Sequence, residues 1–275
     1  SHTCALTAQG QAFCWGENST GALGDGSNTN RNTPTAVAGS FTFAQIAAAN
    51  QLTCASTLQG QALCWGANFD GQLGDGTTTD RNTPTAVAGT HLFIRISAAG
   101  MFDTSSDHAC AIDATGQAWC WGVNNQGQLG TGNLTDSPVP VAVTGGLTFA
   151  EISLGNESSC ALSATGQGFC WGFNFGAQLT APTPVAGGFT YSAIDMGANH
   201  VCGKTATGWL CGGDGGAGQL GDGTSADHQT PVAPSGGLDF SVMAAGGLHT
   251  CGVTANGTYC WGSDNGGQLG TGDVT

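Results

Sequence analysis

A phrase of the form C-x-x-x-x-x-G-x-x-x-C-W-G recurs along this chain of 275 residues. Its clearest copies read CALTAQGQAFCWG from Cys4 and CASTLQGQALCWG from Cys54, and two looser copies close the series. The first cysteines of the six copies stand at positions 4, 54, 110, 160, 202 and 251, so the steps between copies are 50, 56, 50, 42 and 49 residues. A period of this length indicates one supersecondary unit per repeat, stacked into a solenoid, a propeller or an array.

The second repeat reads as four short strands. Residues 43–49 are apolar and uncharged, which suits a buried inner strand. Residues 52–58 and 61–65 predict a hairpin that turns at Gly60. A polar, glycine-rich loop follows over residues 68–81, and residues 83–87 predict an edge strand that tolerates Pro84. No helical pattern interrupts them. The sequence therefore predicts an all-β chain, a β-propeller of four-stranded antiparallel blades that forms a single domain over residues 1–275.

All twelve cysteines lie in the six copies of the phrase, two in each. A hairpin places facing Cβ atoms about 4.5–5.5 Å apart, close to the roughly 3.5–4.5 Å that a disulfide requires. Reduced cysteines that pack as small hydrophobic residues are the alternative. An even cysteine count at fixed spacing is typical of an oxidising compartment, so we expect an extracellular or cell-surface protein. The predicted disulfides are Cys4–Cys14, Cys54–Cys64, Cys110–Cys120, Cys160–Cys170, Cys202–Cys211 and Cys251–Cys260.

The net charge of −14 comes with only four basic residues, which are Arg31, Arg81, Arg95 and Lys204. Nucleic-acid binding is excluded because it needs many lysines and arginines to displace phosphate counterions. No apolar run approaches the length of a membrane span, so membrane insertion is not expected. The sequence also carries no Ser-His-Asp arrangement, phosphate loop or nucleotide fingerprint. It predicts a protein that is not an enzyme and uses no cofactor.

The last repeat carries a family resemblance. Residues 243–251 read MAAGGLHTC and residues 261–272 read WGSDNGGQLGTG. This pattern resembles the regulator of chromosome condensation repeat family, and the resemblance extends over the whole chain. It implies a β-propeller of four-stranded blades, usually seven, that binds a protein partner through one face. The added cysteine pair is similar to exported bacterial members. The nuclear exchange and chromatin roles are not implied, because the basic tails they use are absent here.

Histidines and acidic loops are the candidate ligand residues. The family has histidine two positions before the first cysteine, where it would tie the inner turn to backbone groups. Leu52 and Ser158 interrupt this series, so we predict no metal ring. The loops 24–31, 74–81 and 221–228 begin with Gly-Asp-Gly, which fits either a structural turn or a weak calcium site. The histidines of the series are His2, His108, His200 and His249.

Five tryptophans recur at one repeat position, which is typical of blade core. Trp119 and Trp209 are off that position, so we expect them to be exposed and to contact a partner. Repeat three inserts a loop before His108 that includes Met101, Phe102 and Asp103, a second candidate contact, because repeat proteins place insertions on one face. Repeat four drops most of the loop after Leu179. Glycosylation motifs begin at Asn18, Asn133, Asn156 and Asn256.

The repeat register predicts about 22 strands, because the chain opens at the second strand of a period and stops after the third. Any export signal would lie upstream. Either further residues complete a seven-bladed ring, or a neighbouring chain supplies strands to the open edges. We therefore expect a scaffold, a structural subunit or interaction module of a larger cell-surface or filamentous assembly. The alternative is a soluble secreted protein that inhibits or captures a protein partner through one propeller face.

Overall fold

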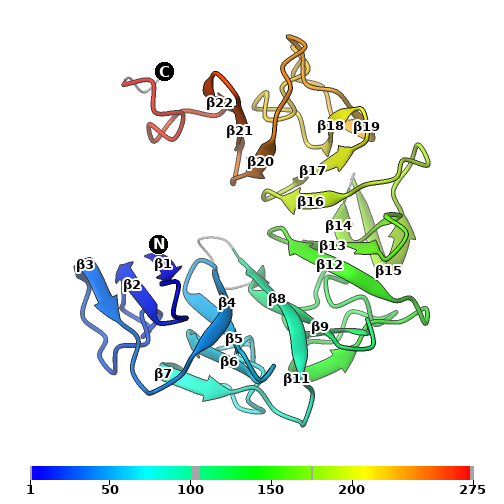
Figure 1. Ribbon diagram of the computed structural model, residues 1–275. Coiled ribbons are helices and arrows are strands. Elements are labelled where there is room, and N and C mark those ends of the chain that lie inside the picture. The colour runs from blue at the N-terminus through cyan, green and yellow to red at the C-terminus, as the bar shows by residue number, and fades with distance from the viewer. Residues whose placement is uncertain (1, 101–105, 175, 273–275) are drawn as a thin grey trace.

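Six antiparallel sheets lie side by side around a common centre in the computed structural model, which describes residues 2–100, 106–174 and 176–272 (Figure 1). The described residues form 22 strands, as the repeat register predicts. Blades 2 to 5 have four strands each, and blades 1 and 6 have three in this part of the chain. The all-β propeller expected from the repeats is thereby confirmed.

The blades follow one another along the chain without crossovers. Blade 1 holds β1 (His2–Leu6), β2 (Ala12–Gly16) and β3 (Arg31–Ala36), and blade 2 holds β4 (Phe43–Ala48), β5 (Leu52–Thr57), β6 (Ala62–Gly66) and β7 (Arg81–Ala86). Blade 3 holds β8 (Phe93–Ala99), β9 (His108–Asp113), β10 (Ala118–Gly122) and β11 (Ser137–Ala142). Blade 4 holds β12 (Phe149–Leu154), β13 (Ser158–Ser163), β14 (Gly168–Asn174) and β15 (Ala177–Pro184). Blade 5 holds β16 (Ala193–Met196), β17 (His200–Thr205), β18 (Gly208–Gly213) and β19 (His228–Val232), and blade 6 holds β20 (Val242–Ala245), β21 (His249–Thr254) and β22 (Gly257–Gly262).

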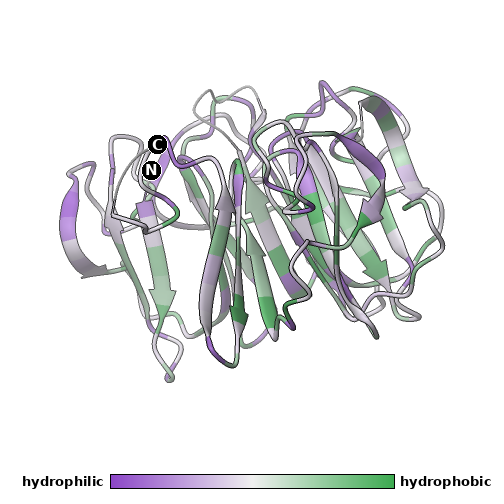
Figure 2. Cartoon of the chain, turned by 90° about the horizontal axis from the view of Figure 1, so that it is seen from above, coloured by the Kyte–Doolittle hydropathy of each residue, from purple (hydrophilic) through white to green (hydrophobic). Residues whose placement is uncertain are grey.

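Antiparallel pairing gives the propeller two chemically different faces. The tight turns that join the two cysteine-bearing strands of each blade lie on one side, which we call the turn face. Long loops from the second cysteine strand to the outermost strand lie on the other side, the loop face, over residues 17–30, 67–80, 123–136 and 214–227. Seen edge-on in Figure 2, the strands run between these faces and carry most of the hydrophobic residues.

The cysteines of each blade face one another across its central hairpin. Cys54 pairs with Cys64 in the strand register, and the other five cysteine pairs occupy the same positions. Their Cα atoms lie 4.1–4.2 Å apart, so each pair closes into a disulfide, and no free cysteine remains in the described residues. All six bonds join the predicted partners.

Each long loop packs against the tryptophan of the next blade. In the first such contact the carbonyl of Ala22 accepts hydrogen bonds from Trp65 Nε1 at 2.9 Å and from Thr53 Oγ1 at 2.8 Å. Gly24 has φ +67° and lies so close that an added Cβ would stand 2.6 Å from the indole nitrogen of Trp65. The loop thus satisfies two buried donors of its neighbour, and glycine allows the approach. We call these four segments the clamp loops.

Three of the five recurring tryptophans lie in the blade core, as predicted, whereas Trp15 and Trp261 in the first and last blades are only partly buried. Trp65, Trp121 and Trp171 have no exposed surface. Each packs on a phenylalanine at the start of an inner strand; in blade 2, Trp65 and Phe43 have ring centroids 6.1 Å apart. Such tilted aromatic pairs contribute about 0.5–1.5 kcal/mol beyond the area that they bury.

Blade 4 differs from the other complete blades because it has no clamp loop. Asn174 at the end of β14 pairs directly with Ala177 at the start of β15, which leaves no room for a long loop. The sequence correctly indicates a shortened connection here. It misplaces the shortening after Leu179, however, because Leu179 lies within β15 and pairs with Gly172.

Candidate protein-binding site

Two of the four basic residues are held inside the clamp loops. The guanidinium Nη2 of Arg31 lies 2.7 Å from Asp25 Oδ2, and that of Arg81 lies 2.8 Å from Asp75 Oδ2. Oδ1 of Asp25 accepts the amide of Ser27 at 2.9 Å, and Asp75 makes the equivalent contact with Thr77. These hydrogen bonds and the arginines hold the pKa of both carboxyl groups below the usual value despite the opposing effect of burial. The Gly-Asp-Gly segments of these two loops therefore act as structural turns.

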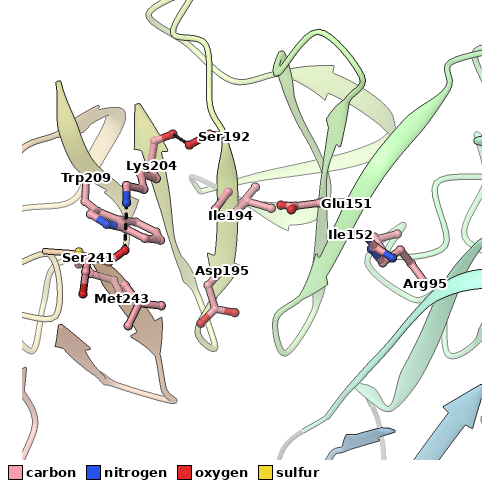
Figure 3. A pocket seen from close by; sticks show the side chains of 12 residues that line it. Arg95, Glu151, Ile152, Ser192, Ile194, Asp195, Lys204, Trp209, Ser241 and Met243 are labelled. Carbon is pink, nitrogen blue, oxygen red and sulfur yellow. Dashed lines mark hydrogen bonds between the residues drawn. The ribbon is translucent and has the colours of Figure 1, made fainter. Parts of the chain in front are cut away.

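The other two basic residues line one cavity on the turn face. Arg95 and Lys204 make no ion pair within the described part of the chain, and both border a cavity of about 610 Å³. In Figure 3, Arg95 lies at one end and Lys204 at the other, with Glu151, Ile194 and Asp195 between them. The cavity thus spans the inner strands of blades 3 to 6, with one positive charge at each end.

Contacts between blades position the polar groups of this cavity. Lys204 Nζ donates to the carbonyl of Ser241 in the next blade at 2.9 Å. Asp195 accepts hydrogen bonds from Ser153 Oγ at 3.3 Å and from the amide of Ala245 at 2.9 Å, so one carboxylate ties three inner strands together. Burial raises the pKa of Asp195, and these hydrogen bonds oppose the shift. Asp195 is structural, whereas the two cations bond only to backbone carbonyls, Arg95 to that of Ile94 and Lys204 to that of Ser241, and neither has a carboxylate partner among the described residues.

Exposed hydrophobic residues adjoin the charged groups. Val242 lines the cavity and is 54 % exposed, and Ile94 beside Arg95 is 47 % exposed. A concave surface that combines apolar patches with a few charged groups has the composition of a protein interface. The sequence analysis did not single out Arg95 and Lys204. A signal was present: Arg31 and Arg81 occupy one position of a repeated RNTPTAVAG segment, whereas Arg95 and Lys204 do not recur.

The structure corrects the expectation that Trp209 is exposed. Trp209 is only 6 % exposed, and its Nε1 donates to the carbonyl of Phe240 at 3.0 Å, so the indole belongs to the core although one edge borders the cavity. Trp119 is partly exposed, and the centroids of its ring and of the His91 ring lie 3.8 Å apart. Its Nε1 donates a hydrogen bond to Asp113 Oδ2 at 2.9 Å. Partner contacts by Trp119 and Trp209 remain predictions. Met101, Phe102 and Asp103 lie outside the described residues.

The histidines before the first cysteines connect neighbouring blades. Nε2 of His2 lies 2.6 Å from Thr53 Oγ1, and Nε2 of His200 lies 2.8 Å from Thr250 Oγ1. His108 makes the same contact with Ser159 at 3.0 Å. Sequence reasoning placed these side chains against backbone groups of the inner turn, and that bond also occurs, from His108 Nδ1 to the carbonyl of Ser106. Their main partner, however, is a hydroxyl of the next blade.

The junctions that lack such a histidine also lack the hydroxyl. At the junction of blades 2 and 3, Leu52 takes the position of the histidine and Ala109 takes that of the hydroxyl residue. At the junction of blades 4 and 5, Ser158 and Val201 take these two positions. A buried imidazole nitrogen left without its hydroxyl partner would cost about 1–3 kcal/mol, which explains why histidine is absent where the hydroxyl is absent. Burial lowers the pKa of His200 to about 4, so the imidazole is neutral at pH 7. The histidines are therefore structural connections.

The described residues contain no group of three or more side chains arranged to hold a metal ion. The described residues also include no helix that is long and apolar enough to cross a membrane. Among the glycosylation motifs, Asn133 and Asn256 are exposed. Asn18 has no exposed surface, and its Nδ2 donates to the carbonyls of Ser27 and Thr29. A sugar cannot be attached there in the folded protein.

Comparisons with known proteins agree with this architecture. The model of the regulator of chromosome condensation (RCC1) repeat matches residues 9–56, 59–102 and 115–162. Human WBSCR16 is similar over 92 % of the chain and 70 % of its own length, with 19 % identity and a TM-score of 0.81. Yeast RCC1 (Prp20), solved with Kap60 bound, is similar over 99 % of the chain and 70 % of its own length, with 23 % identity and a TM-score of 0.83. The ectodomain of the receptor kinase CR4 of Physcomitrella patens is similar over 95 % and 60 %, with 22 % identity and a TM-score of 0.62.

Proposed function

Because this chain belongs to the RCC1 repeat family, we propose that it is a non-enzymatic protein-interaction propeller that works outside the cell as a scaffold. Its turn-face cavity binds the partner, and Arg95 and Lys204 supply the charges that recognise it. One observation carries the proposal: in a chain of net charge −14, the two cations that make no ion pair with any described residue border the same cavity. Opposite charge attracts partners and fixes their orientation, so the partner segment is acidic with apolar side chains.

The six disulfides support the extracellular location. Disulfides persist in oxidising compartments and are rare where glutathione keeps thiols reduced. The CR4 structure bears the name of an ectodomain, so a similar fold serves outside the cell in that receptor. Yeast RCC1 (Prp20) has a structure with Kap60 bound, so a relative of this fold has a protein partner. A chain isolated from its native source with twelve alkylatable thiols would contradict this location.

Cross-linking from the cavity tests the partner site. A photoreactive phenylalanine replaces Val242, which lies in the cavity, and in a matched protein it replaces Leu134, which is 46 % exposed on the loop face. Illumination in native extracellular extract should give a discrete product from position 242 alone. Adding Arg95→Glu should abolish that product. Equal products from both positions, or a product that survives Arg95→Glu, would contradict the turn-face proposal.

The scaffold and the soluble binding protein differ in assembly state. A structural subunit of a cell-surface or filamentous assembly forms ordered polymers, either alone or with its partner. A soluble protein that captures or inhibits one partner sediments as a monomer or a one-to-one complex. Sedimentation velocity on native material, before and after addition of the cross-linked partner, separates the two. Polymers would support the scaffold, and a monomer that binds one partner would replace it with the capture protein.

A further inference from the structure

The junction between blades 4 and 5 lacks the clamp loop that the other blade junctions have. At those junctions a clamp loop of 17–30, 67–80, 123–136 or 214–227 covers the tryptophan of the next blade. At the junction of blades 4 and 5 only the short β14–β15 turn remains. The loop face therefore lacks cover at this one place.

Blade 5 lacks the groups that a clamp loop would satisfy. Gly212 occupies the strand position of the tryptophan, because it faces Val201 in the same register in which Trp171 faces Ser159. Val201 in turn replaces the hydroxyl that donates to the loop carbonyl elsewhere. Both donors are absent where the acceptor is absent, so no donor is left unsatisfied there. The missing loop leaves room on the loop face between the blades.

A cavity of about 590 Å³ occupies this place on the loop face. Phe173 from blade 4 lines one side, and Asn199, Asp214 and Asp227 from blade 5 line the other. A smaller cavity of about 180 Å³ continues between β15 and β19, and Gln229 borders both. A volume of this size admits a long side chain and the backbone that carries it.

The groups around the cavity accept hydrogen bonds. Oδ1 of Asn199 is buried and has no hydrogen-bond partner among the described residues. Asp214 Oδ1 accepts the amide of Gly216, and Asp227 Oδ1 accepts the amide of Gly215, while their second oxygens pair with no described donor. Phe173 is 40 % exposed and presents an aromatic ring to the same space. Two carboxylates, an amide oxygen and an aromatic ring suit a planar, donor-rich cation.

We propose that the cavity between blades 4 and 5 binds an arginine side chain of a partner polypeptide, whose backbone takes the place of the missing clamp loop. The guanidinium satisfies Asn199 Oδ1 and the carboxylates, and it lies beside Phe173. Arginine fits better than lysine, because its five donors form a rigid fork and its plane stacks on aromatic rings. This site faces away from the turn-face cavity, so the propeller holds two partners of opposite charge at once.

Binding of short peptides tests the site on the intact protein. The probe is acetyl-Gly-Arg-Gly-amide, and its control is the peptide with neutral citrulline, which has nearly the same shape. Amide chemical shifts of Gly213 and Gln229 follow the titration. We expect the arginine peptide to bind and the citrulline peptide to bind at least about tenfold more weakly, because charge-assisted hydrogen bonds are roughly twice as strong as neutral ones.

Two variants locate the site. Asp214→Asn should weaken arginine binding by about tenfold and keeps an oxygen for the Gly216 amide. Asp239→Asn removes the same charge from an exposed position outside the cavity and should leave binding unchanged. Equal binding of both peptides, or full binding by Asp214→Asn, would overturn the proposal. Neither result would affect the turn-face cross-link, which uses other residues.

Discussion

The buried histidine between blades 5 and 6 makes the stability of this propeller depend on pH in a way that one substitution should reverse. His200 is 1 % exposed, and its Nε2 lies 2.8 Å from Thr250 Oγ1. The hydroxyl of Thr250 donates to the carbonyl of Gln219, so the imidazole must donate from Nε2. Its Nδ1 is buried without a hydrogen-bond partner among the described residues. A proton on Nδ1 would therefore be both desolvated and unpaired, which is why burial lowers the pKa to about 4 even though Asp214 opposes the shift.

The sign of the effect follows from that pKa. The unfolded chain binds the proton first as the pH falls, because its histidine has a pKa of about 6.5. Stability therefore falls from about pH 6.5 down to about pH 4 and then levels off. Between pH 7.5 and 4.5 the loss amounts to about 2–3 kcal/mol for a difference of this size between the two pKa values.

His200→Leu copies the junction of blades 2 and 3, where Leu52 occupies the equivalent position. At pH 7.5 the variant loses one hydrogen bond, which costs about 1 kcal/mol. At pH 4.5 it escapes the protonation penalty and should be more stable than wild type by about 1–2 kcal/mol. Guanidinium unfolding followed by tryptophan fluorescence, with the disulfides intact, measures both values.

Thr250→Ala is the matched control. It removes the same hydrogen bond but keeps the buried imidazole, so its stability should fall with pH as steeply as that of wild type. If the free energy of unfolding of His200→Leu falls by as much as that of wild type between pH 7.5 and 4.5, the buried imidazole is not the cause of the pH dependence.

Three further predictions concern the clamp loops and the disulfides. Gly132→Ala should cost about 1–2 kcal/mol, because its φ of +82° is strained for alanine but nothing lies within 4 Å of the new Cβ. Gly130→Ala should cost about 1–3 kcal/mol more, since its Cβ would lie 2.9 Å from the Trp171 indole; equal costs in chemical denaturation would contradict the close approach. Trp171→Phe should lose about 1–2 kcal/mol with the bond to the loop carbonyl, and wild-type stability would show that this bond contributes nothing. Replacing Cys110 and Cys120 by alanine should destabilise by about 2–3 kcal/mol, because a loop of 10 residues is no longer closed, and an unchanged denaturation midpoint would exclude this contribution.

The repeated phrase was sufficient to predict the strands, the blades and the disulfides. Each of these depends on residues close together in the sequence: Cys54 and Cys64 are 10 residues apart, and a hairpin turning at Gly60 brings them opposite one another. The alternation of the strands and the glycine turn are local properties. Pattern reasoning is reliable at this range because little else can compete with a short hairpin.

The blade junctions could not be predicted in the same way. Trp65 bonds to Ala22, which lies 43 residues earlier, and His200 bonds to Thr250, which lies 50 residues later. A signal was present in the paired changes at Leu52 with Ala109 and at Ser158 with Val201, but it has meaning only once the blades are seen to be neighbours.

The sequence by itself determined that this chain is a disulfide-linked β-propeller of the RCC1 type, because repeat length, strand pattern and cysteine spacing are local quantities. Only the tertiary structure decided which polar side chains are paired within the chain and which border a cavity. It tied Arg31 to its own clamp loop, brought Arg95 and Lys204 to one cavity, and buried Trp209. Packing between blades sets the exposure and the partners of each side chain, and these two properties decide where a protein can bind another.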